Sequence, residues 1–192
     1  PISETGQNVG WIQKGSLSIA TTPDRLIHVK RQEALAHAYG IEAQSISAGE
    51  ATEIWPLMNA EDVLGAVWSP NDGRVSPSDV CAALVKAARG LGAKLFEKTG
   101  VTGILTENGR IKGVETTQGT VMCEAIALCT GLWSREVGAM AGAEVPVLAC
   151  EHFYLLTKPI DGITGNMPTL SDHDSHLYIR DDSGGLLVGC FE

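Results

Sequence analysis

Two stretches in the last third of the chain carry side chains that could bind a small charged molecule. Residues 147–157 (VLACEHFYLLT) have the composition of a long strand, whose alternation would place His152 and Tyr154 on one face. Tyr178 and Arg180 would share one face of a later strand. Arginine pairs with carboxylates, and His and Tyr can orient or titrate near an amine, so together they would suit a carboxylated amine. The alternative, which the pattern alone favours, is a solvated sheet face of satisfied polar residues.

A glycine turn about two-thirds of the way along the chain is a second candidate for contact with a ligand. Residues 125–129 form a short apolar run typical of a buried strand, Thr130 and Gly131 follow as a tight turn, and residues 132–141 repeat apolar side chains at helical spacing. In an α/β sheet such a junction lies at the carboxyl end of a strand, where ligands bind. The alternative is an ordinary strand-to-helix connection, and the pattern alone favours it.

Residues 172–176 (DHDSH) combine two histidines with two aspartates and resemble a metal-binding cluster in composition. Because they lie between two predicted strands, an Asx turn is the better interpretation, and we expect no metal there. The sequence contains no GxGxxG, no GxxxxGKS/T and no GxSxG motif. It therefore predicts neither a phosphate-binding loop nor a nucleophile elbow within this chain.

Composition limits the classes of partner. The chain has 192 residues, a net charge of −9 and 44% hydrophobic residues, enough for a globular protein with a sizeable core. It has no basic run, which argues against nucleic acid or an anionic membrane as partner, and no apolar run near the roughly 20 residues of a membrane span. Five cysteines without a CxxC pair predict free thiols in a reducing compartment rather than disulfides or a zinc site. Four of them lie in apolar runs and are expected to be buried: Cys81, Cys123, Cys129 and Cys190.

The hydrophobic pattern predicts a mixture of helices and strands. Helices are expected after Thr22 and Ser76, and a shorter one after a capping box that starts at Ser47. The predicted strands are residues 11–22, 41–46, 64–69, 93–97, 101–106, 111–117, 120–123, 125–129, 147–157, 169–170, 177–180 and 186–190. Strands 93–97 and 125–129 should form a parallel pair, and the flanking antiparallel strands should belong to a second sheet.

Several stretches together resemble one protein family in their order and spacing. They are GWIQKGSLSIATTPDRL, IWPLMN, SPNDGRVSPSDV, VTGI, CTGLWSREVGAMAG, EHFYLLTKPI and HLYIR followed by GGLLVG. Over nearly its whole length the chain resembles the FAD-dependent amine oxidoreductases of the D-amino-acid-oxidase superfamily, and within it the dimethylglycine and sarcosine dehydrogenase branch.

The resemblance implies a mixed α/β (α+β) fold. Part of a doubly wound FAD-binding domain would be interleaved with a substrate domain built on an antiparallel sheet. By this assignment residues 1–75 belong to the substrate domain, residues 76–145 to the FAD-binding domain with its β-meander, and residues 146–192 to antiparallel strands of the substrate domain.

The resemblance also implies contacts with the cofactor. Cys129, Thr130, Gly131 and Trp133 match the flavin-contacting turn of the family. Val101 matches the position that reaches the adenine side of FAD through its backbone. The expected cofactor is therefore FAD, with folate as a second ligand if a folate-binding domain accompanies this chain.

For the substrate site the resemblance implies that His152 does the proton transfer, Tyr178 positions the amine and Arg180 binds substrate. The family reaction moves a hydride from an N-methyl carbon, here of dimethylglycine or sarcosine, to FAD, and the iminium product goes on to formaldehyde or to folate. This chemistry needs a neutral amine, which a His and a Tyr near the nitrogen can favour. The electrons would pass to an electron-transfer flavoprotein or to oxygen.

Some family features do not occur in these residues, and two other functions stay open. The GxGxxG unit, the upstream histidine that carries covalent flavin and the C-terminal FAD-binding return are absent, so we expect an internal piece of a longer protein that alone binds FAD weakly or not at all. One alternative is a non-catalytic, protein-binding relative similar to the regulatory subunit of pyruvate dehydrogenase phosphatase. Another is a D-amino-acid or glycine oxidase. The expected location is the mitochondrial matrix or the bacterial cytoplasm.

Overall fold

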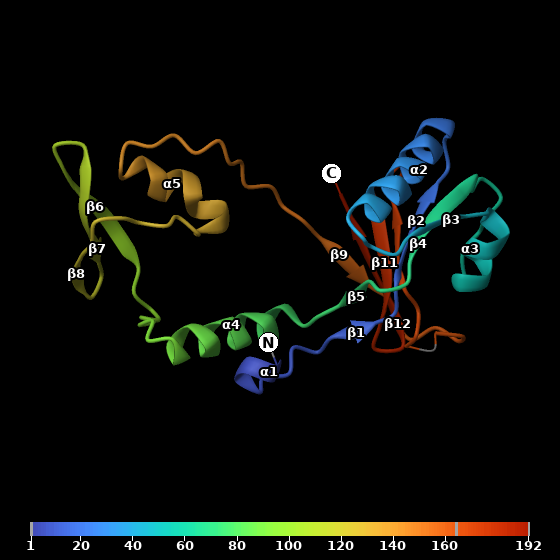
Figure 1. The fold of residues 1–192 in the computed structure, drawn as a ribbon, viewed down its shortest axis with the longest axis horizontal. Helices are drawn as coiled ribbons and strands as arrows, with labels where there is room; N and C mark the ends of the chain where they lie inside the picture. Colours follow the sequence, from blue (N-terminus) through green and yellow to red (C-terminus); the bar gives the residue numbers. More distant parts are fainter. Residues whose placement is uncertain (1, 164, 192) are drawn as a thin grey trace. The chain divides into compact units, whose positions relative to one another are not determined.

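The computed structural model describes residues 2–163 and 165–191, and the chain forms two compact units (Figure 1). The larger unit consists of Pro1–Leu91 and His152–Glu192, and the smaller unit is Gly92–Glu151. Both helices and strands are present, which confirms the predicted mixed α/β class. No helix among the described residues is long and apolar enough to cross a membrane.

A seven-stranded sheet forms the centre of the larger unit. Its strands lie in the order β3-β4-β2-β10-β11-β12-β9. Neighbours are antiparallel except for the parallel pair β2 and β10. The bounds are β2 Ser16–Ala20, β3 Gln44–Ile46, β4 Gly65–Ser69, β9 Tyr154–Leu156, β10 Thr169–Asp172, β11 Leu177–Asp182 and β12 Gly185–Cys190.

The core lies on one face of this sheet because apolar residues alternate along its strands. Leu17 is 1% exposed, and together with Leu170 it packs in a cluster with side chains of α3 (Ala48–Ile54) and its C-cap Trp55. The indole nitrogen of Trp55 donates a hydrogen bond to the carbonyl oxygen of Pro168 at 3.0 Å. The opposite face is covered at β2, β3 and β4 by α2 (Pro23–Ala38), whose Val29 is fully buried.

The helix starts follow the predicted capping residues. Thr22, Ser47 and Ser76 each accept a hydrogen bond through the side chain from the backbone N–H three residues later, at the starts of α2, α3 and α4 (Pro77–Gly90). Satisfying these otherwise unpaired N–H groups stabilises each first turn. The remaining elements of this unit are α1 (Ile2–Thr5), which packs beside α4, and the paired strands β1 (Ile12–Gln13) and β5 (Gly73–Arg74).

The smaller unit contains the predicted antiparallel meander. Strands β6 (Val101–Glu107), β7 (Arg110–Thr116) and β8 (Gly119–Met122) form one sheet, and Asn108 and Gly109 make the first turn with positive φ angles of 51° and 73°. A 3₁₀ turn, Gly131–Trp133, leads into α5 (Ser134–Ala139).

The predicted parallel pair of strands in this unit is wrong. Neither residues 93–97 nor residues 125–129 are strands, and residues 93–97 are exposed throughout. A strand exists only when its backbone groups pair with a neighbour, and the described residues provide no ladder partner for either segment. An apolar run of this length shows that a segment could form a strand, but it does not show whether a neighbouring strand is there to pair with it.

Other strand predictions also need correction. The predicted strand 147–157 contains strand structure only at β9, so His152 precedes the strand and the alternation argument does not apply to it. The predicted strand 11–22 is divided into β1 and β2, with Gly15 between them at a φ of +78°.

The cysteines are free, as predicted, but they are not buried. Cys81 and Cys129 are exposed, and Cys123 and Cys190 are partly exposed. An apolar run was a poor guide to burial here because an element buries only the face that meets a neighbour. In α4, for example, only Ala83 is fully enclosed.

Candidate active-site residues and cofactor-binding hollow

Three aromatic rings meet at one end of the large sheet. The ring centroids of His152 and Tyr178 are 6.1 Å apart with nearly parallel planes, and the ring of Phe191 lies 5.4 Å from each of them. The Nε2 atom of His152 lies 3.4 Å from the hydroxyl oxygen of Tyr178, slightly longer than the roughly 2.7–3.2 Å of an ordinary hydrogen bond to nitrogen. His152 is exposed and Tyr178 is half-buried, so water and small molecules can reach this pair.

The hairpin of β11 and β12 sets the position of Tyr178. In its register Tyr178 lies directly opposite Gly189, and Gly189 in turn lies opposite Tyr154 of β9. Phe191 follows β12, and its backbone N–H donates to the carbonyl oxygen of His176 at 2.6 Å. Phe191 and Gly189 were not among the predicted site residues, although a register counted from the turn at residues 183–184 would have paired Gly189 with Tyr178.

Arg180 shares the sheet face of Tyr178, as predicted from strand alternation. Its guanidinium forms an ion pair with the carboxylate of Asp182, with Nη2 and Oδ2 3.0 Å apart. A substrate carboxylate would therefore have to share or displace this partner. The structure thus brings His152 and Tyr178 together but gives Arg180 an acidic neighbour that was not among the predicted site residues.

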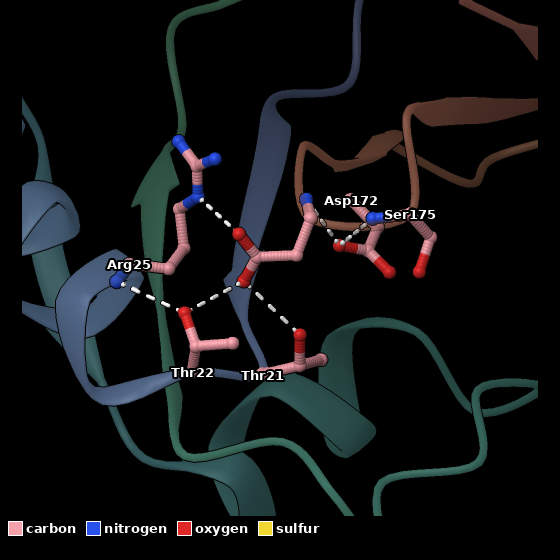
Figure 2. A network of polar contacts seen from close by, with 6 residues as sticks. Thr21, Thr22, Arg25, Asp172 and Ser175 are labelled. Carbon is pink, nitrogen blue, oxygen red and sulfur yellow. Dashed lines mark hydrogen bonds and ion pairs between the residues drawn. The ribbon is translucent and has the colours of Figure 1, made fainter.

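The segment of residues 172–176 forms a turn, in agreement with the sequence interpretation. The Oδ1 atom of Asp172 accepts hydrogen bonds from the backbone N–H groups of Asp174 and Ser175, which defines an Asx turn (Figure 2). Within the described part of the chain, no group of three or more His, Cys, Asp or Glu residues could hold a metal ion.

The same turn is tied to the start of α2. The carboxylate of Asp174 accepts from Nε of Arg25 at 2.9 Å and from the hydroxyl groups of Thr21 and Thr22 at 3.1 Å each (Figure 2). Burial raises the pKa of Asp174, but these hydrogen bonds and the charge of Arg25 outweigh it, so the net pKa is lowered. The carboxylate form therefore holds the β10–β11 turn against the helix start.

A second candidate site lies in the smaller unit. A hollow of about 800 Å³ is lined by residues before and at the start of β6, by the 3₁₀ turn and by α5. Its lining includes all five residues expected to contact the cofactor: Val101, Cys129, Thr130, Gly131 and Trp133. The hydroxyl groups of Thr130 and Ser134 form a hydrogen bond with their oxygen atoms 3.1 Å apart. Ser134 is buried, so this bond links the turn to the interior of the unit.

Comparison with known proteins identifies the family. The family model for FAD-dependent oxidoreductases (DAO) matches residues 2–192. The chain belongs to the DAO family of FAD-dependent oxidoreductases. Mouse mitochondrial sarcosine dehydrogenase is 40% identical over 194 residues, covering 98% of this chain and 21% of that protein. The mouse mitochondrial regulatory subunit of pyruvate dehydrogenase phosphatase is 41% identical over 193 residues, covering 98% of this chain and 22% of that protein.

The fold of this DAO-family chain also matches a solved structure. L-Proline dehydrogenase from P. horikoshii superimposes with a TM-score of 0.83 at 30% sequence identity, over 98% of this chain and 50% of that one. The DAO-family chain thus spans about a fifth of the length of these curated relatives and half of the length of that solved structure.

The hollow has the properties expected for contact with the family cofactor. Gly131 has a φ of +56°, a backbone conformation that residues with a side chain rarely adopt. Among the described residues other than Gly131 and its two chain neighbours, no heavy atom lies within 4 Å of where its Cβ would be. Trp133 is 63% exposed and lines the same space with an apolar ring. A flat, partly apolar group such as a flavin fits these features.

Proposed function

We propose that the protein containing this chain oxidises a small N-methylated amino acid, such as sarcosine or dimethylglycine, with FAD as its oxidant. The observation that carries the proposal is the pair His152 and Tyr178, whose polar atoms lie 3.4 Å apart at an accessible position. Membership in the FAD-dependent family and 40% identity to a sarcosine dehydrogenase support this substrate class.

In this proposal His152 and Tyr178 keep the substrate amine in its neutral form. An ammonium group has no lone pair to stabilise the positive charge that develops as the neighbouring carbon loses a hydride. A histidine within hydrogen-bond reach can accept the ammonium proton, and a tyrosine hydroxyl can orient the nitrogen or relay that proton. Arg180 would attract the substrate carboxylate, with Asp182 limiting how strongly it does so.

The residues of the hollow would hold the cofactor, with Val101 and the turn of Cys129, Thr130, Gly131 and Trp133 as its contacts. When bound, the flavin would supply the electron-accepting group of the reaction. In the same proposal, an electron-transfer flavoprotein or oxygen reoxidises the flavin. The proposed location is the mitochondrial matrix or the bacterial cytoplasm.

The test is anaerobic flavin reduction in the intact protein. Sarcosine, dimethylglycine and glycine are mixed separately with the protein, and the loss of oxidised flavin absorbance is followed. We expect reduction by the N-methylated amines and at least about 100-fold slower reduction in His152→Gln, since general acid–base groups contribute on the order of 10² to 10⁴ in rate. Tyr178→Phe should also slow the reaction.

Matched control variants separate these roles from general damage. His28→Gln and Tyr39→Phe make the same chemical changes at exposed positions in α2 and at its C-cap, and they should leave the rate unchanged. Flavin that no N-methylated amine reduces would refute the proposal.

A regulatory, protein-binding role is the second candidate. The specific observation in its favour is the 41% identity to the regulatory subunit of pyruvate dehydrogenase phosphatase, against 40% identity to sarcosine dehydrogenase. The same experiment distinguishes the two, because a purely regulatory protein would show no reduction by any amine. Turnover of glycine with oxygen would instead favour a glycine oxidase.

A further inference from the structure

We propose that Gly189 is a positioning residue for Tyr178: its missing side chain is what allows the tyrosine ring to lie across β12 toward His152. The inference rests on the proposed function for its catalytic consequence, but its geometric part stands on the sheet alone. Nothing in the motif GGLLVG distinguishes this glycine from the turn glycines before it, and only the register does so.

A side chain at position 189 would overlap with the ring of Tyr178. A Cβ atom built on Gly189 would lie 2.1 Å from Cζ, 2.2 Å from Cε1 and 2.4 Å from the hydroxyl oxygen of Tyr178. Non-bonded carbon atoms attract each other at roughly 3.5–4.0 Å and repel strongly at these distances. Any residue other than glycine would therefore force the reactive end of the tyrosine ring to move.

The backbone itself does not require glycine at this position. Gly189 lies within β12 and has no positive φ, in contrast to the turn residue Gly184 with a φ of +81°. An alanine would fit the strand conformation, so the tyrosine ring is what excludes a side chain here. The substitution Gly189→Ala thus perturbs the ring with little direct effect on the strand.

Displacing the ring would alter the arrangement around His152. With glycine beneath it, the Tyr178 ring lies 5.4 Å from the Phe191 ring and its hydroxyl 3.4 Å from Nε2 of His152. That contact is already long, so a ring shift of about 1 Å would break it. Misplacement of this size at a reacting centre can cost on the order of 100-fold in rate.

The first experiment reads the ring position without any substrate. The intact flavoprotein carries 3-fluorotyrosine at position 178, and its ¹⁹F resonance is compared in the unaltered protein and in Gly189→Ala. The nearby rings of His152 and Phe191 should make the resonance sensitive to ring movement, so we expect a clear shift. Gly90→Ala is the matched control, because Gly90 ends α4 and a Cβ there meets open space among the described residues. An unchanged resonance in Gly189→Ala would overturn the proposal.

The second experiment separates a clash with the ring from a general loss of stability. Gly189→Ala should lower the melting temperature of the unaltered protein, and it should lower that of the Tyr178→Ala variant by less, because the ring it would clash with is gone. An equal loss in both backgrounds would contradict a clash with Tyr178. This comparison decides the question even if the single variant folds poorly.

The third experiment measures flavin reduction. Gly189→Ala should slow it by on the order of tenfold to 100-fold, and in the Tyr178→Ala background it should cause no further loss. A shifted resonance with an unchanged rate would refute the catalytic consequence of the positioning. If the unaltered protein reduces no flavin with any amine, the proposed function fails, while the ¹⁹F shift and the stability comparison still decide whether Gly189 places the ring.

Discussion

The ion pair of Arg74 and Asp181 should be the most costly polar interaction of the larger unit to break. Asp181 lies on β11 between Arg180 and Asp182 but points to the opposite sheet face, where it is 3% exposed. The Nη1 and Nη2 atoms of Arg74 donate to its two carboxylate oxygens at 2.8 and 3.0 Å, and Nη1 also donates to its carbonyl oxygen at 3.0 Å. The hydrogen bond to Asp181 raises the pKa of Arg74, although burial lowers it.

The two single substitutions should differ in cost because the two partners differ in burial. Arg74→Leu leaves a nearly fully buried carboxylate without its cation, which typically costs about 3–5 kcal/mol in the free energy of unfolding. Asp181→Leu leaves Arg74, whose side chain is 23% exposed and can turn toward water, so we expect a smaller loss of about 1–3 kcal/mol. The double leucine variant should be less destabilised than Arg74→Leu alone, because no charge is left buried.

The assay is urea unfolding of the intact protein followed by circular dichroism. Arg31→Leu, at an exposed position of α2, is the control and should change the unfolding free energy by less than about 0.5 kcal/mol. Two results would contradict this prediction. One is a loss below about 1 kcal/mol in the free energy of unfolding for Arg74→Leu, and the other is a loss in the double variant at least as large as the sum of the losses in the two single variants.

Three further predictions concern the hollow, the β10–β11 turn and a helix start. Gly131→Val should weaken FAD binding to the apoprotein, as measured by flavin fluorescence. The control Gly142→Val has a similar positive φ but lies outside the lining of the hollow, so it should only lower stability. Equal FAD affinities of the two variants would argue against Gly131 as a contact. Because the pKa of Asp174 is lowered in the folded protein, its stabilising contribution is complete above its unfolded value of about 3.9 and is lost as the pH falls through the lower folded value. The melting temperatures of Asp174→Asn and of the unaltered protein should therefore converge as the pH falls into the acid range. The control Asp161→Asn, at an exposed position, should have the melting temperature of the unaltered protein at every pH. A difference in melting temperature between Asp174→Asn and the unaltered protein that stays constant with pH would contradict this prediction. Ser47→Ala removes a helix cap and should cost about 1 kcal/mol in urea unfolding, and no measurable loss would contradict the capping role.

Local signals in the sequence were reliable where the structure is itself local. The capping residues Thr22, Ser47 and Ser76 marked three helix starts, because a cap is a contact between residues three positions apart. Asn108 and Gly109 marked the first turn of the meander, because a positive φ at both positions favours these residue types. The Asx turn at Asp172 was predicted for the same kind of reason.

Strand predictions failed where pairing decides the outcome. Residues 93–97 and 125–129 have suitable side chains but no ladder partner among the described residues. Whether an apolar run becomes a strand depends on a neighbour that its own residues do not specify. The burial of the cysteines was mispredicted for a related reason, since burial also depends on what packs against a segment.

For the candidate site, the residue types alone determined the kind of chemistry: a histidine and a tyrosine suited to an amine, an arginine suited to a carboxylate, and a Thr-Gly turn suited to close contact with a ligand. Only the tertiary structure decided which of these side chains meet. The β11–β12 register puts Gly189 beneath Tyr178, and the chain before β9 brings His152 to the tyrosine hydroxyl. These are contacts between residues up to 26 positions apart, and they follow from strand pairing and packing rather than from any local preference.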